Sequence, residues 1–524
     1  MSTSVDGSDH AHRSFLGAAK LIAACTLASL VLGAVRDVLM AFYFGAGLVT
    51  SAFVTAWTVP NLFRRLFGEG AVSPALVPVF TTSIRTGLPD DTRRLFSVTF
   101  TAMFLFLAAL TLLIEAVVNG LRGWGTFGDR TTLVLDYTAL LMPYMLLICL
   151  TAFFMAVLNA YRHFFAPAVM PVVLNVVWIT SLYVIFRLTG DQASAGRRLA
   201  VAILVGGGLQ LLFQVPFAMR FGVRLRPSLD FSHPGFRQIV RLWIPVIVGS
   251  AVIQVNAVLD RALAYFIVPD DGSAAYLFFG NRLMHFPISL IGVAISTAVL
   301  TPLSEHAATG ETERFKRTLM AALRVTLFLA IPAGIGLMAL SSPIIELLFR
   351  RGEFTSHAAT RTAWVVFCYC LSVWAQTGVF VLLRGFYALK DTRTPVRVAV
   401  AVVLLNLTLN LTFIWFLDEA GLALATSISG MVQFVVLLAI LRRRLGPMGG
   451  REVAVVSLKT LAVSLVMGVA AAAAWYWCWP GEAGLAVRAG VLSSILLGAI
   501  IVFIVGARLL RTDELTQILR IRSR

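Results

Sequence analysis

Charged residues are scarce in this sequence. Only 13% of its 524 residues are Asp, Glu, Lys or Arg, whereas 59% are hydrophobic, and the mean hydropathy is +0.87. A soluble domain carries about a quarter charged residues, because its exterior must face water. This sequence has too few polar side chains to cover such an exterior, so we expect lipid to be its solvent.

The motifs of common enzyme and metal sites are also missing. There is no Gly-rich phosphate-binding loop with Lys and Ser or Thr, and no His or Cys set with metal-ligand spacing. No carboxylate pair lies in a loop large enough to hold a sugar nucleotide. The five cysteines all lie in apolar stretches, as packing residues do: Cys25, Cys149, Cys368, Cys370 and Cys478. We therefore expect no enzyme, no cofactor and no metal.

Long apolar stretches make up most of the chain. A helix that crosses a bilayer needs about 20 apolar residues, and roughly fourteen such stretches follow one another. The sequence thus predicts an all-α integral membrane protein. Residues 1–13 are polar and are expected to be disordered. The loops near 121–130, 187–197 and 220–237 are too short to form a soluble domain.

Basic residues collect in alternate loops. If the N-terminus is cytoplasmic, the cytoplasmic loops and a basic tail, residues 511–524, hold most of the Lys and Arg. This bias is typical of multi-pass membrane proteins and places both termini in the cytoplasm. It also explains the net charge of +17 by topology and contact with anionic lipid, without a nucleic-acid partner.

The two halves of the chain resemble each other at an offset of 223 residues. The matched positions are Ala71, Ser73, Ala75, Thr86 and Gly87 with Ala294, Ser296, Ala298, Thr309 and Gly310. Both segments end a span and enter a cytoplasmic loop, which predicts a parallel repeat of two six-helix lobes, 14–222 and 223–445. Two further helices, 446–510, lie outside the repeat. Such proteins usually transport by alternating access between the lobes.

Ionisable residues inside apolar stretches mark candidate sites, because a charge at the bilayer centre costs about 2.5–3.5 kcal/mol or more. In the first helix Ser29, Gly33 and Arg36 share one face, with Asp37 beside the arginine. Gly33 would allow a bulky ligand or another backbone to approach this face. A structural ion pair between Arg36 and Asp37 is the alternative interpretation.

The second helix carries its own polar stripe. Asn61, Arg65 and Glu69 share a face, whereas Arg64 points about 100° away and is free to enter a cavity. The spacing of Arg65 and Glu69 also suits a structural pair.

The second lobe offers Asp260 and Arg261, followed in the next helix by Asn281, Arg282 and His285. Asp260 and Arg261 can alternatively mark a helix end, and His285 can be a packing histidine. Near the centre of the two lobes, Arg36, Arg64 and Arg282 exceed the nearby acids that could neutralise them. Guanidinium groups bind phosphate oxygens in two-pronged fashion, so this excess predicts an anionic cargo.

Several motifs, in order along nearly the whole chain, resemble the MurJ/MviN lipid II flippases of the multidrug/oligosaccharidyl-lipid/polysaccharide exporter superfamily. They are Gly33 to Asp37 (GAVRD), Phe44 to Gly47 (FGAG), Pro60 to Ser73 (PNLFRRLFGEGAVS), Gly207 to Gln210 (GGLQ), Arg282 to Pro287 (RLMHFP), Gly385 to Tyr387 (GFY) and Asp391 to Pro395 (DTRTP). The stretch from Pro60 to Ser73, with its adjacent arginines, is highly specific.

The resemblance implies a V-shaped, two-lobed, fourteen-helix fold in the bacterial inner membrane. The cargo would be the undecaprenyl-diphosphate-linked peptidoglycan precursor, moved from the cytoplasmic to the periplasmic leaflet, with cell-wall synthesis proteins as further candidate partners. The family's cavity arginines map onto Arg36, Arg64 and Arg282, and its cavity serines onto Ser29 and Ser273. Its last two helices form a groove for the lipid tail.

Some positions depart from the family. Leu30 stands where an arginine is usual, and Ser51, Asn281 and His285 stand where acids are usual. These departures bear on gating ion pairs and on coupling to an ion or to the membrane potential. A flippase for another polyprenyl-diphosphate-linked oligosaccharide is the main alternative. A drug or cation antiporter is a weaker one, because its cavity would be dominated by carboxylates.

Overall fold

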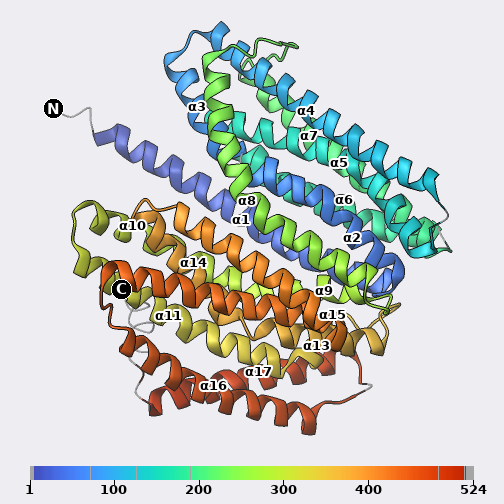
Figure 1. The fold of residues 1–524 in the computed structure, drawn as a ribbon, viewed down its shortest axis with the longest axis vertical. Helices are drawn as coiled ribbons and strands as arrows, with labels where there is room; N and C mark the ends of the chain where they lie inside the picture. Colours follow the sequence, from blue (N-terminus) through green and yellow to red (C-terminus); the bar gives the residue numbers. More distant parts are fainter. Residues whose placement is uncertain are drawn as a thin grey trace. The chain divides into compact units, whose positions relative to one another are not determined.

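The computed structural model describes residues 5–70, 72–125, 127–188, 190–481 and 483–510, together with Thr512 and Glu514. This part of the chain is helical almost throughout and contains no strand, which confirms the predicted all-α class (Figure 1). The predicted basic tail lies outside the described residues except at Thr512 and Glu514.

Two compact units divide the chain, residues 1–258 and 259–524. The first contains α1 (Val5–Phe44), α2 (Leu48–Phe63), the π-helix η1 (Arg64–Gly70), α3 (Val72–Thr86), α4 (Pro89–Trp124), α5 (Asp129–Ala160), α6 (Phe165–Leu188), α7 (Gln192–Arg220) and most of α8 (Pro234–Phe266). Helix α1 extends back to Val5, into the segment for which we expected disorder. No proline interrupts that segment.

The second unit contains the end of α8 and the remaining helices. These are α9 (Ser273–Pro287), the π-helix η2 (Ile288–Val293), α10 (Ala294–Ala308), α11 (Thr312–Ala339), α12 (Ser341–Leu348), α13 (Ser356–Cys370), α14 (Val373–Ala388), α15 (Arg393–Leu445), α16 (Gly450–Cys478) and α17 (Leu485–Leu509). Helices α16 and α17 occupy the predicted segment 446–510.

The boundary between the units lies later than residue 222, where the sequence suggested it. The first part of α8 packs on unit 1: the ring of Trp243 lies 5.7 Å from that of Phe67, and Ile239 is buried in the core of unit 1. Apolar side chains on one end of α8 thus decide to which unit that end belongs.

Both units contain a π-helix, and the two lie at the offset of the predicted repeat. Segment η1 follows Pro60 in α2, and η2 follows Pro287 at the end of α9. Shifting η1 by the offset found in the sequence places it on η2. A π-helix at equivalent positions of both units supports the repeat. Such π-helical turns also occur frequently at functional sites.

Helix lengths fit a membrane protein. By length and composition, ten of the described helices can cross a membrane, or eleven if α13 and α14, which meet at 43°, form one span. Helix α15 is two helices joined at Asp418, whose backbone is not helical (φ 51°, ψ −136°). The number fourteen stays a prediction.

Tight packing of aromatic side chains holds unit 1 together. Tyr137, Tyr144 and Phe153 of α5 are fully buried. A Cβ on Gly207 of α7 would lie 2.9 Å from the Tyr144 ring, so only glycine permits this approach of α7 to α5. In unit 2, α11, α14 and α15 share a core that includes Leu323, Leu382 and Leu437.

Candidate functional site

Arg36 of α1, the first predicted arginine, lies in a polar cluster with α6. Its Nε and Nη2 donate to Oδ1 of Asp37 at 3.0 and 2.7 Å, and its Nη1 donates to Oδ1 of Asn175 at 3.1 Å. Its Cζ also lies 4.8 Å from the centroid of the Trp178 ring. Asn175 Nδ2 in turn donates to the backbone oxygen of Ser29 at 3.1 Å and lies 3.4 Å from its Oγ. We call these five residues the Arg36 cluster.

The Arg36 cluster joins predicted residues with two that sequence reasoning missed. The ion pair of Arg36 with Asp37 is formed, and its side chains are only 12% and 9% exposed. A pair so deeply buried needs further hydrogen bonds to offset its desolvation, and Asn175 supplies one. An asparagine in the middle of the largely apolar α6 was the signal that could have marked Asn175 as a polar contact, although not its partner.

The second predicted arginine lies where α2 becomes η1. Arg64 Nε donates to Oδ1 of Asn61 at 2.9 Å, so Asn61 binds the arginine three residues on. Arg65 Nη1 donates to Oε1 of Gln254 in α8 at 3.3 Å. The predicted pair of Arg65 with Glu69 stays a prediction, because the Glu69 side chain lies outside the described residues.

In unit 2 the predicted residues fall into two places. Arg282 lies over the ring of Phe278, one turn earlier on α9, at 5.2 Å, and Arg261 of α8 contacts the same ring at 5.6 Å. Arg282 and His285 are both exposed on α9. Asp260 accepts a hydrogen bond from Asn410 Nδ2 of α15 at 2.6 Å, so it is tied to another helix.

Ser273, predicted to line the cavity, is fully buried at the start of α9. Its Oγ donates to the backbone oxygen of Asp270 at 2.8 Å and lies 3.5 Å from Glu419 Oε2. Ser273 therefore belongs to a network that sequence reasoning did not assemble.

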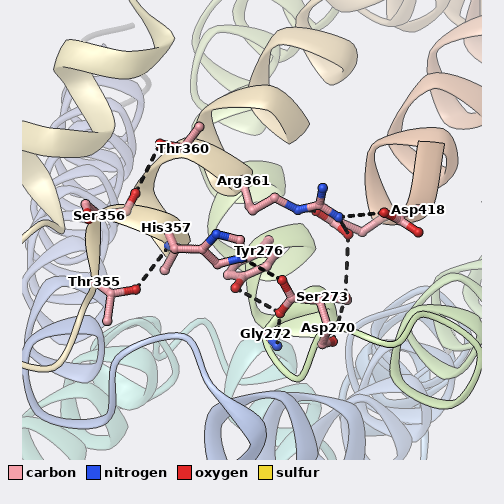
Figure 2. Close-up of polar contacts among 12 residues, drawn as sticks. Asp270, Gly272, Ser273, Tyr276, Thr355, Ser356, His357, Thr360, Arg361 and Asp418 are labelled. Atoms are coloured by element: carbon pink, nitrogen blue, oxygen red, sulfur yellow. Dashed lines mark hydrogen bonds and ion pairs between the residues drawn. The ribbon is translucent and has the colours of Figure 1, made fainter.

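This network connects α9, α13 and the kink of α15 (Figure 2). The Asp270 carboxylate accepts from the Gly272 backbone N–H at 2.8 Å and from Tyr276 at 3.0 Å, and it lies 2.8 Å from His357 Nε2. We call Asp270, Ser273, Tyr276, His357, Arg361, Asp418 and Glu419 the α9–α13–α15 network.

Arg361 of α13 supplies a positive charge to the α9–α13–α15 network. Its Nε and Nη2 each lie 2.8 Å from an oxygen of Glu419, and Nη2 also donates to Asp418 at 2.9 Å. The Glu419 side chain is only 1% exposed, so its charge depends on this two-pronged partner.

Helices α16 and α17 enclose an apolar groove of about 690 Å³. Its lining includes Ala470 and Ala474 of α16 and Gly490, Ser494 and Gly498 of α17. The last three recur every four residues, so they form a stripe of small side chains on one helix face.

Comparisons with known proteins agree on one family. The family model described as lipid II flippase MurJ matches residues 40–479. A probable lipid II flippase MurJ of Vibrio cholerae is 35% identical over 429 residues, which cover 80% of this chain and 81% of the relative. The lipid II flippase MurJ of Burkholderia cenocepacia is 31% identical, covering 80% and 82%.

Solved structures extend the similarity to the fold. A structure titled as lipid II flippase MurJ in an inward closed conformation superposes with a TM-score of 0.77 at 26% identity, covering 94% of this chain and 99% of that one. An inward-facing multidrug resistance transporter of the MATE family reaches a TM-score of 0.64 at 12% identity, covering 80% and 94%. That second likeness shows the fold alone.

Proposed function

This chain belongs to the lipid II flippase MurJ family, and we propose that it moves lipid II from the cytoplasmic to the periplasmic leaflet for peptidoglycan synthesis. It is a multi-pass protein of the bacterial inner membrane and a transporter. We propose further that it has no enzymatic activity, that both termini are cytoplasmic, and that it works by alternating access without a cofactor.

The observation that carries the proposal is that each cargo-binding candidate is an arginine held in place by a partner in its own unit. Asp37, Asn175 and Trp178 fix Arg36, Asn61 fixes Arg64, and the Phe278 ring lies against Arg282. A guanidinium with a fixed plane loses less entropy when it binds two phosphate oxygens. The three arginines would bind the diphosphate of the cargo.

The remaining predicted residues take supporting roles. Ser29 and Asn61 orient Arg36 and Arg64, and Asp37 balances the charge of Arg36. Asp260, Arg65, Glu69 and His285 stay candidates for gating, with coupling to an ion or to the membrane potential. Ser273 holds the start of α9, because its hydroxyl is buried and bonded inside unit 2.

We assign the prenyl tail to the groove between α16 and α17. Keeping the tail in apolar surroundings while the headgroup crosses avoids exposing a long hydrocarbon to water. The small side chains of the stripe leave room for such a chain.

The test replaces Arg36, Arg64 and Arg282 singly by alanine in a bacterium depleted of its own flippase. We expect each variant to fail to restore growth, with lipid II remaining inaccessible to a probe outside the inner membrane. Arg198→Ala, an exposed arginine of α7, is the matched control and should restore growth. Full rescue by all three variants at normal protein levels would overturn the assignment.

A further inference from the structure

A second cavity lies in unit 1, and it shares no lining residue with the Arg36 cluster or η1. It has a volume of about 420 Å³ and lies between α4, α5 and α7, which run side by side in Figure 1. Five of its seven lining residues are polar or charged: Glu115, Asn119, Arg122, Asp136 and Arg197, with Ala139 and Leu140 completing the lining. Three apolar helices can pack together without a polar cavity of this size, so packing alone does not explain it.

Asp136 of α5 organises the cavity. Its Oδ1 lies 2.7 Å from Arg122 Nη2 of α4, and its Oδ2 lies 3.0 Å from Arg197 Nη2 of α7. The close approach of α7 depends on Gly196, because a Cβ there would lie 2.2 Å from the Tyr137 hydroxyl. One carboxylate thus holds two guanidinium groups from different helices at the same opening.

After these bonds are made, Arg122 and Arg197 still have N–H groups that can donate hydrogen bonds to a ligand in the cavity. Arg122 Nη1 donates to Asn119 at 3.1 Å, whereas its Nε is buried and has no hydrogen-bond partner within the described part of the chain. A buried N–H without an acceptor costs about 1–3 kcal/mol, so an acceptor bound in the cavity would recover that energy. Arg197 is half exposed and can offer its remaining N–H groups to the same ligand.

Charges of both signs line the cavity in equal number. Arg122 and Arg197 stand against Asp136 and Glu115, and Asp136 is already bound to both arginines. Glu115, about two turns before Arg122 on α4, adds a second acceptor. A ligand with a phosphate and a separate hydrogen-bond-donating cation would complement this pattern, whereas a purely anionic ligand would meet the Glu115 carboxylate unpaired.

The surroundings of the cavity indicate lipid. On α4 the side chains of Leu112 and Leu113 are 69% and 61% exposed, and Trp124 at the helix end is 92% exposed. Apolar side chains that end in a tryptophan are typical of a surface that runs from the bilayer interior to its interface. The cavity therefore opens at the depth where phospholipid headgroups lie.

We propose that this cavity binds a phospholipid with a primary ammonium headgroup, phosphoethanolamine, with its phosphate on Arg122 and Arg197 and its ammonium on Glu115. Asp136 acts as the positioning residue that holds both arginines. The site is separate from the proposed cargo site and takes a lipid of the surrounding membrane.

The experiment measures lipid retained by the full chain in native mass spectrometry, after exchange into detergent with defined phospholipids. We expect wild type to retain phosphatidylethanolamine over phosphatidylglycerol and phosphatidylcholine. Arg197→Gln should lower retention of phosphatidylethanolamine by about tenfold, while Arg198→Gln, its neighbour outside the cavity, should leave it unchanged. Glu115→Gln should abolish the preference for phosphatidylethanolamine over phosphatidylcholine, because the phosphate contacts remain.

Two outcomes would overturn the proposal. One is equal retention of phosphatidylethanolamine and phosphatidylglycerol by wild type, and the other is an equal effect of Arg197→Gln and Arg198→Gln. If Arg197→Gln fails to fold, Arg197→Lys keeps the charge but loses two-pronged binding. It should retain less phosphatidylethanolamine than wild type at an unchanged melting temperature, and wild-type retention by this variant would count against the site.

Discussion

Asn175 of α6 accepts a hydrogen bond from Arg36 of α1 at 3.1 Å. The same amide donates to Ser29 on the preceding turns of α1. One buried side chain therefore joins two residues of the predicted binding face and fixes α1 to α6. The arginine that we propose to bind the diphosphate depends for its orientation on a helix that carries no predicted site residue.

Asn175→Ala should weaken both transport and stability. Loss of the amide removes the hydrogen bonds to Arg36 and Ser29 and leaves the Arg36 guanidinium with one fewer partner, which costs about 1–3 kcal/mol. The free energy of unfolding and the rescue of a flippase-depleted strain measure the two effects. Thr26→Ala on the exposed side of α1, whose hydroxyl bonds only its own helix, is the control. Wild-type stability of Asn175→Ala would show that the amide does not support Arg36.

Arg361→Gln should destabilise unit 2 by about 3–5 kcal/mol, because it leaves the buried Glu419 carboxylate without its cation. The double variant Arg361→Gln with Glu419→Gln should recover much of that loss, since the buried side chain at 419 then carries no charge. Thermal unfolding of the single and double variants in one detergent gives the comparison. A double variant no more stable than the single one would contradict the assigned ion pair.

Acid should weaken the α9–α13–α15 network through Asp270, which lies in the loop between α8 and α9. Burial by itself raises the pKa of Asp270, but hydrogen bonds from His357, the Gly272 backbone and Tyr276 outweigh it and leave the pKa below its usual value of 3.8. A depressed carboxyl pKa contributes stability that is present above the unfolded value and is lost as the pH falls through the folded one.

The melting temperature of wild type should therefore fall between pH 5 and pH 3 more steeply than that of Asp270→Asn, which cannot titrate there. Equal slopes for wild type and Asp270→Asn would remove Asp270 from the acid response.

Filling the groove between α16 and α17 should reduce transport without unfolding the protein. A Cβ on Gly498 would meet no atom within 4 Å, so the side chain of Gly498→Leu starts in open space and extends into the groove that Gly498 lines. We expect at least a tenfold loss of lipid II flipping at normal protein levels, roughly the effect of 1.4 kcal/mol on binding. Leu497→Phe, on the exposed neighbour, adds volume outside the groove and should transport normally. Normal flipping by Gly498→Leu would exclude the groove as the tail site.

Arg36 and its neighbour Asp37 could be predicted from the sequence. A charge inside an apolar stretch costs free energy, which marked Arg36 as a candidate site, and Asp37 was named as its candidate ion-pair partner. The partners Asn175 and Trp178 were not found, because Asn175 lies 139 residues away along the chain. A single asparagine in a long apolar helix gives no indication of which helix it faces.

The α9–α13–α15 network shows the same limit. Ser273 was expected in a cavity, and Arg361 was not among the predicted site residues. Both lie in one network because the non-helical backbone at Asp418 turns α15 so that Glu419 meets Arg361 of α13. Asp418 and Glu419 interrupt the apolar run and mark the break in the sequence, but nothing in the sequence indicates which helix the break turns towards.

The sequence by itself determined the all-helical membrane fold, the repeat and the positions of the expensive charges. These follow from local properties: the solvent of each stretch, its length and the cost of a charge in lipid. Only the tertiary structure decided which charges are paired, where α8 divides between the units and which small residues line a groove. Those outcomes depend on contacts between helices distant in sequence, where packing selects one neighbour among many apolar surfaces.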